Sequence, residues 1–561
     1  MYKKVISAIM ISAMLCGVLS PMQYVQATGE NSNTQTATEN TSGKVTEVTT
    51  ESTPEVTTEI TTEIKTEEST EPTTEVPQNT PVNREDDPNY VVTGLSPSDS
   101  KVVLLDPGHC KTHPGASKNG LREEEVVLDI AKACQSKLDK YADVTVYMTR
   151  TAGTCCNKLG LGDCLSSRNN YAKQLDADFL ISMHINAGSS SGANALVAYK
   201  SGYHDNVRKE TQAFGKLVLK KLEGLGIKNR GFLLRKSGTG NRYSNGKLAD
   251  YYSIVRRGVV YNIPSMIIEH GYVTSSSDCN KFFKTKAKRT KVGNADADAI
   301  ISYYKLKTRV TEGKPDKQKD GTYFITKEGK KALGWVKYNG KWYFFDKETG
   351  KMKTGMIEDD GESYFLDKKT GEMKVGWIKN GSTNYIARGD GTIVKGQAYC
   401  DGMYTYLLNS SGKQLKMGLH TVNGKTYYVN NKKRVLSGVL NIDGKHYLFD
   451  SETMAMCYGY TKQGNKYYYA DQETGVLACN KIVTVNGTQY YFGKSGARQT
   501  GWVKYKKAKY YFSTSDGKMI KGWKKIKGKY YYFSKTTGKM QKSKWIGNYY
   551  VNSKGVRTKK K

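Results

Sequence analysis

Three apolar runs in the middle of the chain each lead to a residue that can bind a metal ion or carry a proton. The runs and their end residues are Val102–Leu105 with His109, Phe179–Met183 with His184, and Pro264–Ile268 with Glu269. Short apolar runs bounded by turn residues are typical of buried strands. In open α/β sheets, ligands bind outside the carboxyl ends of the strands. The three runs therefore predict one site at one edge of a sheet.

The two histidines are candidate zinc ligands, because neutral imidazole binds zinc and a catalytic zinc takes three protein ligands and a water molecule. The third ligand is expected to be a carboxylate or another histidine. Glu123, Glu124 and Glu125 open a predicted helix, where acidic side chains also complement the helix dipole. Successive helical positions point about 100° apart, so one of the three can still turn inward. The local sequence does not select which.

Glu269 ends an apolar strand, where a carboxylate is unfavourable unless it is used. It could activate a zinc-bound water and carry the proton to a leaving amine. Either histidine, taken alone, is as readily a structural or surface residue. The catalytic interpretation therefore depends on all of these positions occurring together.

Residues 99–307 are predicted to form an α/β domain with a mixed sheet flanked by helices, because strand and helix patterns alternate along them. The expected strands are Val102–Leu105, Val144–Met148, Phe179–Met183, Ala195–Tyr199 and Met266–Ile268. The expected helices are Glu124–Tyr141, Leu165–Leu175, Val207–Glu223 and a stretch from about Asn294 to Tyr304.

The amino-terminal segments are predicted to lie outside this domain. Residues 1–27 have the pattern of a cleaved signal peptide, with Lys3 and Lys4 before an apolar stretch shorter than the roughly 20 residues that span a membrane. Residues 28–98 are rich in Thr, Glu and Ser and poor in apolar side chains, which predicts a disordered linker. No later segment is apolar enough to span a membrane, so we expect an exported protein.

Residues 308–561 are predicted to form a β-hairpin repeat solenoid. Glycine followed by an aromatic or apolar residue recurs at a step of about 21 residues, within the range typical of solenoids. Each unit carries a Tyr-rich strand, and Asn339-Gly340 and Asn423-Gly424 are expected at hairpin turns. Since one hairpin cannot bury its aromatic face alone, neighbouring units are expected to cover each other.

The cysteines leave the redox state open. Ten are present, and without Cys16 of the predicted signal peptide nine remain, an odd number that leaves at least one unpaired within the chain. Cys155, Cys156 and Cys164 lack a paired Cys-x-x-Cys spacing, which argues against a structural zinc knuckle. Because an exported protein can form disulfides, a loop disulfide of Cys155 or Cys156 with Cys164 stays open.

A set of motifs spread over the α/β domain resembles one enzyme family. The motifs are Asp106–His109, Asn119–Glu123, Met148–Arg150, Leu165–Asn169, Ala177–Ala187 and Pro264–Tyr272. Together they resemble the zinc-dependent N-acetylmuramoyl-L-alanine amidases of the Amidase_3 type. The resemblance implies hydrolysis of the amide between the lactyl group of N-acetylmuramic acid and L-alanine in peptidoglycan.

Carried over by position, the resemblance implies zinc ligands at His109, Glu123 and His184 and a catalytic base and acid at Glu269. It thus selects Glu123 among the three adjacent glutamates. In the family, zinc polarises the carbonyl and lowers the pKa of its water toward roughly 7. Arg168 is expected to support the fold or the substrate rather than the chemistry.

Three features depart from the family pattern. Cys110 stands where glycine is usual, and its thiol could compete for metal or respond to oxidants. His270 stands where an uncharged residue is usual, and it either tunes Glu269 or is exposed. The insertion around 154–162 has no clear counterpart. None of the three removes a ligand.

The array resembles the wall-binding repeats of choline-binding and glucan-binding proteins, in which aromatic side chains box a quaternary ammonium. The family's Gly-Trp pair is kept at Trp335, Trp377, Trp502 and Trp523, so choline cages are expected only near the two ends. The excess of 87 Lys and Arg over 53 Asp and Glu, a net charge of +34, suits anionic wall polymers such as teichoic acid. Nucleic acid is a poor partner for an exported wall protein.

These features predict a secreted, wall-associated zinc amidase whose repeats bind choline, teichoic acid or a polysaccharide. The alternatives are a non-catalytic wall-binding adhesin or scaffold, and a zinc peptidase that cuts stem peptides. The adhesin requires loss of a ligand or of Glu269, and the sequence has neither.

Overall fold

The computed structural model describes residue 84 and residues 87–561. The predicted signal peptide and most of the predicted linker lie outside these residues. Among the helices that the structure describes, none has both the length and the apolar character needed to cross a membrane.

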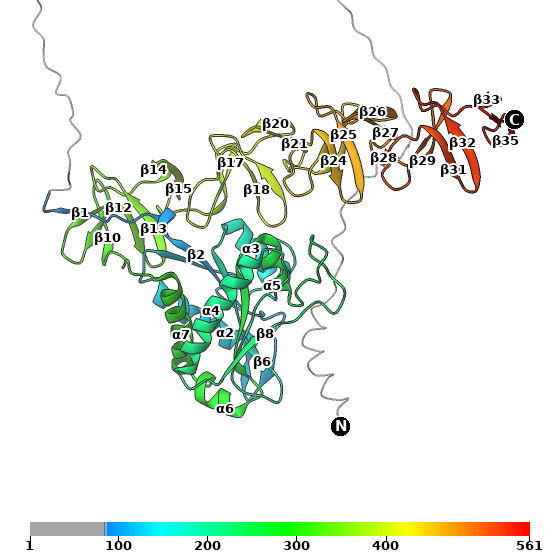
Figure 1. Ribbon diagram of the computed structural model, residues 1–561. Coiled ribbons are helices and arrows are strands. Elements are labelled where there is room, and N and C mark those ends of the chain that lie inside the picture. Colours follow the sequence, from blue (N-terminus) through cyan, green and yellow to red (C-terminus); the bar gives the residue numbers. More distant parts are fainter. Residues whose placement is uncertain (1–83, 85–86) are drawn as a thin grey trace, which may run out of the picture. The chain divides into compact units, whose positions relative to one another are not determined.

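A six-stranded mixed sheet forms the centre of the α/β domain, in the order β5-β2-β6-β9-β7-β8 (Figure 1). The strands are β2 (Lys101–Pro107), β5 (Val144–Met148), β6 (Phe179–Asn186), β7 (Ala193–Leu196), β8 (Asn229–Leu233) and β9 (Ser265–Tyr272). β5, β2, β6 and β9 run parallel to one another. β7 is antiparallel to β9 and parallel to β8. The predicted fold class is confirmed.

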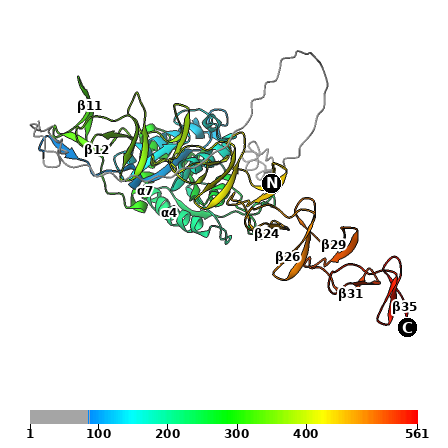
Figure 2. The same ribbon diagram turned by 90° about the horizontal axis from the view of Figure 1, so that it is seen from above.

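Helices cover both faces of this sheet. One face carries α2 (Glu123–Leu138), α4 (Asp205–Glu223) and α7 (Lys286–Tyr304), and the other carries α3 (Cys164–Leu175) and α5 (Ser253–Tyr261); α4 and α7 lie side by side (Figure 2). Val103 and Leu105 of β2 pack under the first group, whereas Val102 and Leu104 pack against the second. Side chains alternate across a strand, so burial on both faces gives the continuous apolar run seen in the sequence.

Several element boundaries differ from the prediction. The last helix begins at Lys286, earlier than expected, because its first turns are Lys-rich and show no apolar pattern. The strand expected over Ala195–Tyr199 spans Ala193–Leu196. β8 and α5 were not predicted; β8 is a largely exposed edge strand without apolar alternation. Short elements complete the domain: η1 (Pro97–Asp99), β3 (Ser117–Lys118), β4 (Leu121–Arg122), η2 (Cys156–Leu159), α6 (Ser276–Asp278) and η3 (Cys279–Phe283).

The remainder of the chain is a series of antiparallel hairpins, as predicted. It begins with β10 (Gly313–Gln318) and β11 (Gly321–Thr326). The hairpins that follow are β12 (Lys331–Tyr338) with β13 (Lys341–Phe345), β14 (Gly355–Asp359) with β15 (Glu362–Leu366), β16 (Gly376–Asn380) with β17 (Thr383–Ala387), β18 (Ala398–Cys400) with β19 (Thr405–Leu407), β20 (Gly418–Val422) with β21 (Lys425–Val429), β22 (Gly438–Ile442) with β23 (Lys445–Phe449), β24 (Gly459–Gln463) with β25 (Lys466–Ala470), β26 (Lys481–Val485) with β27 (Thr488–Phe492), β29 (Gly501–Tyr505) with β30 (Ala508–Phe512), β31 (Gly522–Ile526) with β32 (Lys529–Phe533) and β33 (Lys544–Ile546) with β34 (Tyr549–Val551). β28 (Arg498–Gln499) and β35 (Arg557–Lys560) add third strands.

Local turn chemistry sets this repeat. Asn339 and Gly340 have φ of 51° and 74°, the left-handed pair that a tight two-residue hairpin turn requires. After each hairpin the chain turns again; in the first, Asp346 Oδ1 accepts a hydrogen bond from the Thr349 amide at 2.8 Å. Gly350 then takes a φ of 69°, which favours glycine. The predicted hairpin turns are confirmed.

The predicted linker ends before residue 98. Tyr90–Val92 forms β1, which pairs in parallel with β12 over Lys331–Leu333. The Thr93 hydroxyl also donates to the Trp335 carbonyl at 2.7 Å. This segment is ordered because the edge of β12 supplies backbone partners, which the composition of the segment does not reveal.

The first repeats pack directly on the α/β domain. Trp342 Nε1 donates a hydrogen bond to Thr145 Oγ1 at 2.9 Å, and both residues are buried. The Gly389 amide donates to the Leu175 carbonyl at 2.7 Å. A Cβ at Gly389 would lie 2.5 Å from a methyl group of Val102, so the contact requires glycine. The α/β domain and the first repeats therefore share a packed interface.

Candidate active site

Parallel pairing brings the three predicted strand ends to one edge. β2, β6 and β9 are adjacent, with Pro107 opposite Met183 and His184 opposite Glu269. Residues paired across neighbouring strands point to the same face. The His184 and Glu269 side chains are therefore neighbours, and His109 follows the end of the adjoining strand.

Glu123 joins both histidines. Its Oε1 lies 3.2 Å from His109 Nε2 and 3.0 Å from His184 Nδ1. The amides of Ala116 and Ile185 donate to its two oxygens at 2.9 and 3.1 Å. Burial alone would raise the pKa of Glu123, but hydrogen bonds and charge from the two histidines lower it below its ordinary value. The carboxylate is thus fixed in its charged form.

The other two glutamates face elsewhere. Glu124 is buried in an ion pair with Arg122, and the Glu125 side chain is 62% exposed. Glu123 is positioned because the β3–β4 hairpin leads directly into the first turn of α2. The structure thus brings Glu123, and neither of its neighbours, to His109 and His184.

Two glycines allow the close approach of these groups. A Cβ at Gly108 would lie 2.4 Å from the His184 ring. A Cβ at Gly115 would lie 2.5 Å from Glu123 Oε2 and 2.7 Å from the His109 ring. His109 itself has a φ of 62°, an unusual conformation for a non-glycine residue that is characteristic of functional sites.

A buried ion pair holds the loop that carries His109. Asp106 and Arg168 pair at the end of β2, and both are almost fully buried. Arg168 Nη2 also donates to the His109 carbonyl at 2.9 Å. Thr149 and Ser182 hydroxyls donate to Asp106, each at 2.6 Å. Arg168 is therefore placed to position the loop, in agreement with its expected supporting role.

Glu269 stands apart from this hydrogen-bond network. Its Oε2 is buried and has no hydrogen-bond partner among the described residues. Burial, followed by the negative charge of Glu123, raises the pKa of Glu269 well above its ordinary value. A carboxyl group with a raised pKa on the strand beside His184 is suited to take up and release a proton.

His270 is fully buried, so the alternative that it is exposed is wrong. Its Nε2 lies 2.9 Å from Asp296 Oδ2, and its Nδ1 lies 3.1 Å from the His184 carbonyl. The side chain thus points to the far side of β9 from Glu269, since neighbouring strand residues alternate. It braces the backbone of His184 and connects it to α7.

The donor set fits a catalytic zinc ion. One ligand atom each of His109, Glu123 and His184 lie within 4.8 Å of one another. Two imidazoles and one carboxylate are a ligand set used by catalytic zinc, which keeps one position open. The unpartnered oxygen of Glu269 lies on the strand beside this set.

Comparison with known proteins decides the family. Residues 103–302 match the family described as N-acetylmuramoyl-L-alanine amidase. The α/β domain belongs to this family. The array matches choline-binding repeats over residues 332–377 and 500–545, and a putative cell wall binding repeat over 483–497.

Two relatives that match the α/β domain are themselves named as N-acetylmuramoyl-L-alanine amidases. Over 230 residues the chain is 29% identical to N-acetylmuramoyl-L-alanine amidase LytC of Bacillus subtilis (strain 168), covering 39% of this chain and 41% of the relative. It is 26% identical over 213 residues to the sporulation-specific N-acetylmuramoyl-L-alanine amidase of the same strain, covering 38% and 71%. The chain therefore spans less than half the length of LytC. Among solved structures, CbpJ from Streptococcus pneumoniae TIGR4 is 23% identical, with a TM-score of 0.32, covering 44% of this chain and 100% of that one.

The four tryptophans proposed as wall-ligand aromatics differ in exposure. Trp335 is only 1% exposed and packs against Trp342, Phe344 and Tyr364, so it is a core residue and not a ligand aromatic. Trp377 and Trp502 are 36% and 42% exposed. The expectation is wrong at Trp335 because rings of its own hairpin and of the next one bury it, in a cluster that also includes Ala142 of the α/β domain.

Arginine side chains fill aromatic clusters that resemble cation cages. The Arg557 guanidinium lies over the rings of Trp523, Tyr530 and Tyr549, 4.1 Å from the ring centroid of Tyr530. Trp502 contacts Tyr531 of the next hairpin at 4.9 Å between ring centroids. No Lys or Arg lies over the Trp502 ring in the part of the chain that the structure describes. An external cation thus meets less competition at Trp502 than at Trp523.

Beyond the predicted site, the structure assembles a thiol cluster. Cys110, His113, Cys155 and Cys164 place their ligand atoms within 4.8 Å of one another. All nine cysteines of the described residues are free thiols. The Cys110-x-x-His113 spacing is the sequence signal that points to this cluster, and a search for Cys-x-x-Cys pairs alone misses it.

Proposed function

We propose that this chain hydrolyses the amide between the lactyl group of N-acetylmuramic acid and the L-alanine of the stem peptide. The observation that carries the proposal is the convergence of His109, Glu123 and His184 beside Glu269 in a domain of the amidase family. We propose His109, Glu123 and His184 as the ligands of a catalytic zinc ion. When bound, zinc supplies a Lewis acid for the carbonyl and for water.

The chain's own residues contribute proton transfer and positioning. Glu269 has a raised pKa and an unpartnered oxygen, so it is suited to accept a proton from water and pass it to the leaving amine. Glu123 is held by the amides of Ala116 and Ile185, which fix its orientation between the histidines. Asp106 and Arg168 fix the loop that presents His109.

We further propose that the protein is secreted and that the array keeps it on the cell wall. The match to wall-binding repeats supports wall association, and the exposed aromatic ring of Trp502 supports binding of a choline-type cation. The excess of lysine and arginine over acidic residues supports attraction to anionic polymers such as teichoic acid. Binding to walls stripped of teichoic acid would separate these receptors, since undiminished binding excludes that polymer as the main one.

Product analysis tests the reaction. The full chain is incubated with purified peptidoglycan, with and without a chelator, and the new ends are identified by mass spectrometry. We expect free L-alanine amines paired with intact lactyl ends, and no products in chelator. Cleavage inside the stem peptide would instead favour the zinc peptidase, and absence of any cleavage would favour the adhesin.

Glu269→Gln tests the proton carrier. General acid–base catalysis contributes about 10² to 10⁴ in rate, so we expect a loss of that size with zinc content unchanged. Glu125→Gln is the matched control, because the Glu125 side chain is exposed on the same turn as the ligand Glu123, and it should keep full activity. Wild-type turnover in the Glu269→Gln variant would rule out the assigned role.

A further inference from the structure

Four side chains that can bind a metal ion form a cluster that begins at Cys110, directly after His109. Cys110 and His113 flank a tight turn that follows β2, Cys155 precedes η2, and Cys164 is the first residue of α3. Their ligand atoms all lie within 4.8 Å of one another. Two segments of the chain, 110–113 and 155–164, thus contribute to one compact cluster.

The distances within the cluster suit a tetrahedral metal ion. His113 Nδ1 lies 3.3 Å from Cys110 Sγ and 3.9 Å from Cys155 Sγ. With Zn–S of about 2.3 Å and Zn–N of about 2.0 Å, tetrahedral coordination places sulfur and nitrogen ligands about 3.5 Å apart. The observed distances lie on either side of this value.

The backbone holds these ligands in place without a metal ion. The Cys110 and His113 amides and carbonyls exchange two hydrogen bonds, of 3.1 and 2.9 Å, which close the turn. The Lys111 amide donates to the Gly153 carbonyl at 2.9 Å and ties this turn to the loop of Cys155. Asp163 caps α3 and fixes the start of the helix at Cys164. The cluster is therefore preorganised from both sides.

A positive charge lies where such a site needs one. Three thiolates and one Zn²⁺ carry a net negative charge, and Arg168 Nη2 donates to Cys164 Sγ at 3.7 Å. Hydrogen bonds of this kind to ligand atoms support metal sites. Arg168 also donates to the His109 carbonyl, so one guanidinium contacts both the cluster and the loop that presents His109.

We propose that Cys110, His113, Cys155 and Cys164 bind a second, structural zinc ion. A Cys₃His set with four protein ligands leaves no open position, as expected for a structural rather than a catalytic site. The ion joins the turn directly after His109 to the start of α3 and so stiffens the loop that presents His109. The proposal goes beyond the hydrolysis and holds whether or not that reaction is correct.

Metal content tests the proposal. The full chain is purified without chelator, and zinc per chain is measured by mass spectrometry. We expect about two zinc ions in the wild type and about one in Cys155→Ser and in Cys164→Ser. His184→Ala should also lose about one, but from the other site. One zinc ion in the wild type, unchanged by Cys155→Ser and Cys164→Ser, would overturn the proposal.

Cobalt separates the two sites by spectroscopy. When Co²⁺ replaces zinc, thiolate ligands give an intense charge-transfer absorption in the near ultraviolet, whereas a site with two histidines and a glutamate has no thiolate. We expect this absorption in the wild type and in His184→Ala, and its loss in Cys155→Ser. The absorption of the wild-type protein alone already tests for thiolate ligands, so the test does not depend on the folding of any variant.

Two further variants distinguish zinc from disulfides. Cys156 is buried and follows Cys155 in the sequence, but it is not one of the four proposed ligands. Cys156→Ser should therefore keep two zinc ions. Cys457→Ser, in the array, is the control for loss of a thiol elsewhere. Non-reducing peptide mapping that finds Cys110, Cys155 or Cys164 in a disulfide in the purified protein would contradict the metal site.

Discussion

At the scale of single residues, the site depends on close contacts that are possible only because glycine has no side chain. Gly108 has no positive φ, so its conformation would accept alanine, but the added Cβ would lie 2.4 Å from the His184 ring. We expect Gly108→Ala to displace this ring. Since a misplacement of about 1 Å can cost about 10²-fold in rate, activity on peptidoglycan should fall by roughly that factor, and zinc content should fall with it.

The control for this prediction is another glycine of the amidase domain. Gly238 has no positive φ, and a Cβ added there would have no heavy atom within 4 Å. Gly238→Ala should therefore leave both rate and zinc content at the wild-type level. Equal activity of Gly108→Ala and the wild type would show that the His184 ring can move without loss of function.

The sequence identified the site residues unequally well. His109, His184 and Glu269 follow from apolar runs, because burial on both faces of a strand makes the run continuous and its polar end conspicuous. Glu123 could not be chosen over Glu124 from the residues alone, since both are buried and their directions depend on the β3–β4 hairpin. The Cys110-x-x-His113 spacing indicates the thiol cluster, but the approach of Cys155 and Cys164 depends on loop conformation, which leaves no periodic signal.

At the scale of elements, Trp502 and Trp545 lie on the first strands of their hairpins but have different surroundings. Trp502 on β29 is 42% exposed and meets Tyr511 of its own hairpin and Tyr531 of the next. A choline-type cation over such rings contributes about 1–2 kcal/mol, roughly a tenfold change in affinity. We expect Trp502→Ala to weaken choline binding about tenfold, measured by calorimetric titration of the full chain.

Trp545→Ala provides the matched control. Trp545 is equally exposed at 42%, but Lys561 Nζ already lies 5.3 Å from its ring centroid. Its removal should therefore change choline affinity little. If Trp545→Ala weakened binding as much as Trp502→Ala, or if the wild type did not bind choline, the cage at Trp502 would be refuted and another wall polymer would be the receptor.

The repeat elements could be predicted where they depend on local turn residues. They could not be predicted where they depend on packing against a distant part of the chain. The Asn339-Gly340 turn needs two residues with a left-handed backbone conformation, and the Asn-Gly pair in the sequence indicates it. The parallel pairing of Tyr90–Val92 with β12 could not be predicted, because a short strand outside the repeats carries no sign of its partner. The cluster that buries Trp335 includes Ala142 of the amidase domain, a contact that the repeat sequence does not reveal either.

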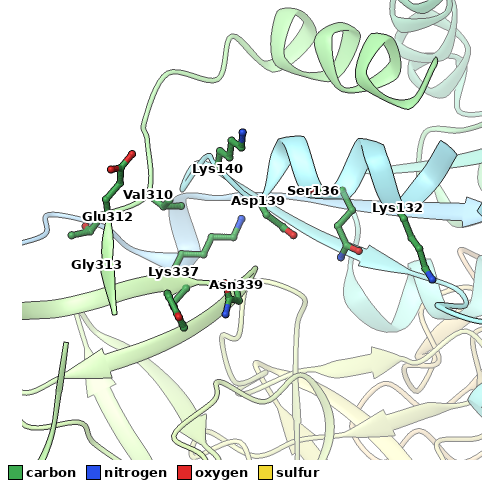
Figure 3. Close-up of a pocket in the computed structure, with 12 residues that line it drawn as sticks. Lys132, Ser136, Asp139, Lys140, Val310, Glu312, Gly313, Lys337 and Asn339 are labelled. Carbon is green, nitrogen blue, oxygen red and sulfur yellow. The ribbon is translucent and has the colours of Figure 1, made fainter. Parts of the chain in front are cut away.

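At the scale of the whole molecule, a buried lysine connects the array to the amidase domain. Lys337 of β12 is 1% exposed, and its Nζ donates to the carbonyls of Tyr141, at 2.9 Å, and Val144. It lines a pocket of about 630 Å³ between α2 and the first repeat, with Asp139 opposite (Figure 3). None of the proposed catalytic or metal-binding residues lines this pocket. Changes at Lys337 should therefore affect the stability of this interface and not catalysis.

Burial lowers the pKa of Lys337 from 10.5 to about 8, although Asp139 and Asp143 oppose the change. Because the folded-state value lies below the ordinary one, protonated Lys337 destabilises the folded state below pH 8, and this penalty disappears as the pH rises to 10.5. The wild type should therefore gain up to about 3 kcal/mol relative to Lys337→Met across that window. Urea unfolding followed by tryptophan fluorescence measures the difference, with Lys379→Met, on the exposed face of β16, as the control. A stability difference between wild type and Lys337→Met that stays constant with pH would show that Lys337 is not desolvated at this interface.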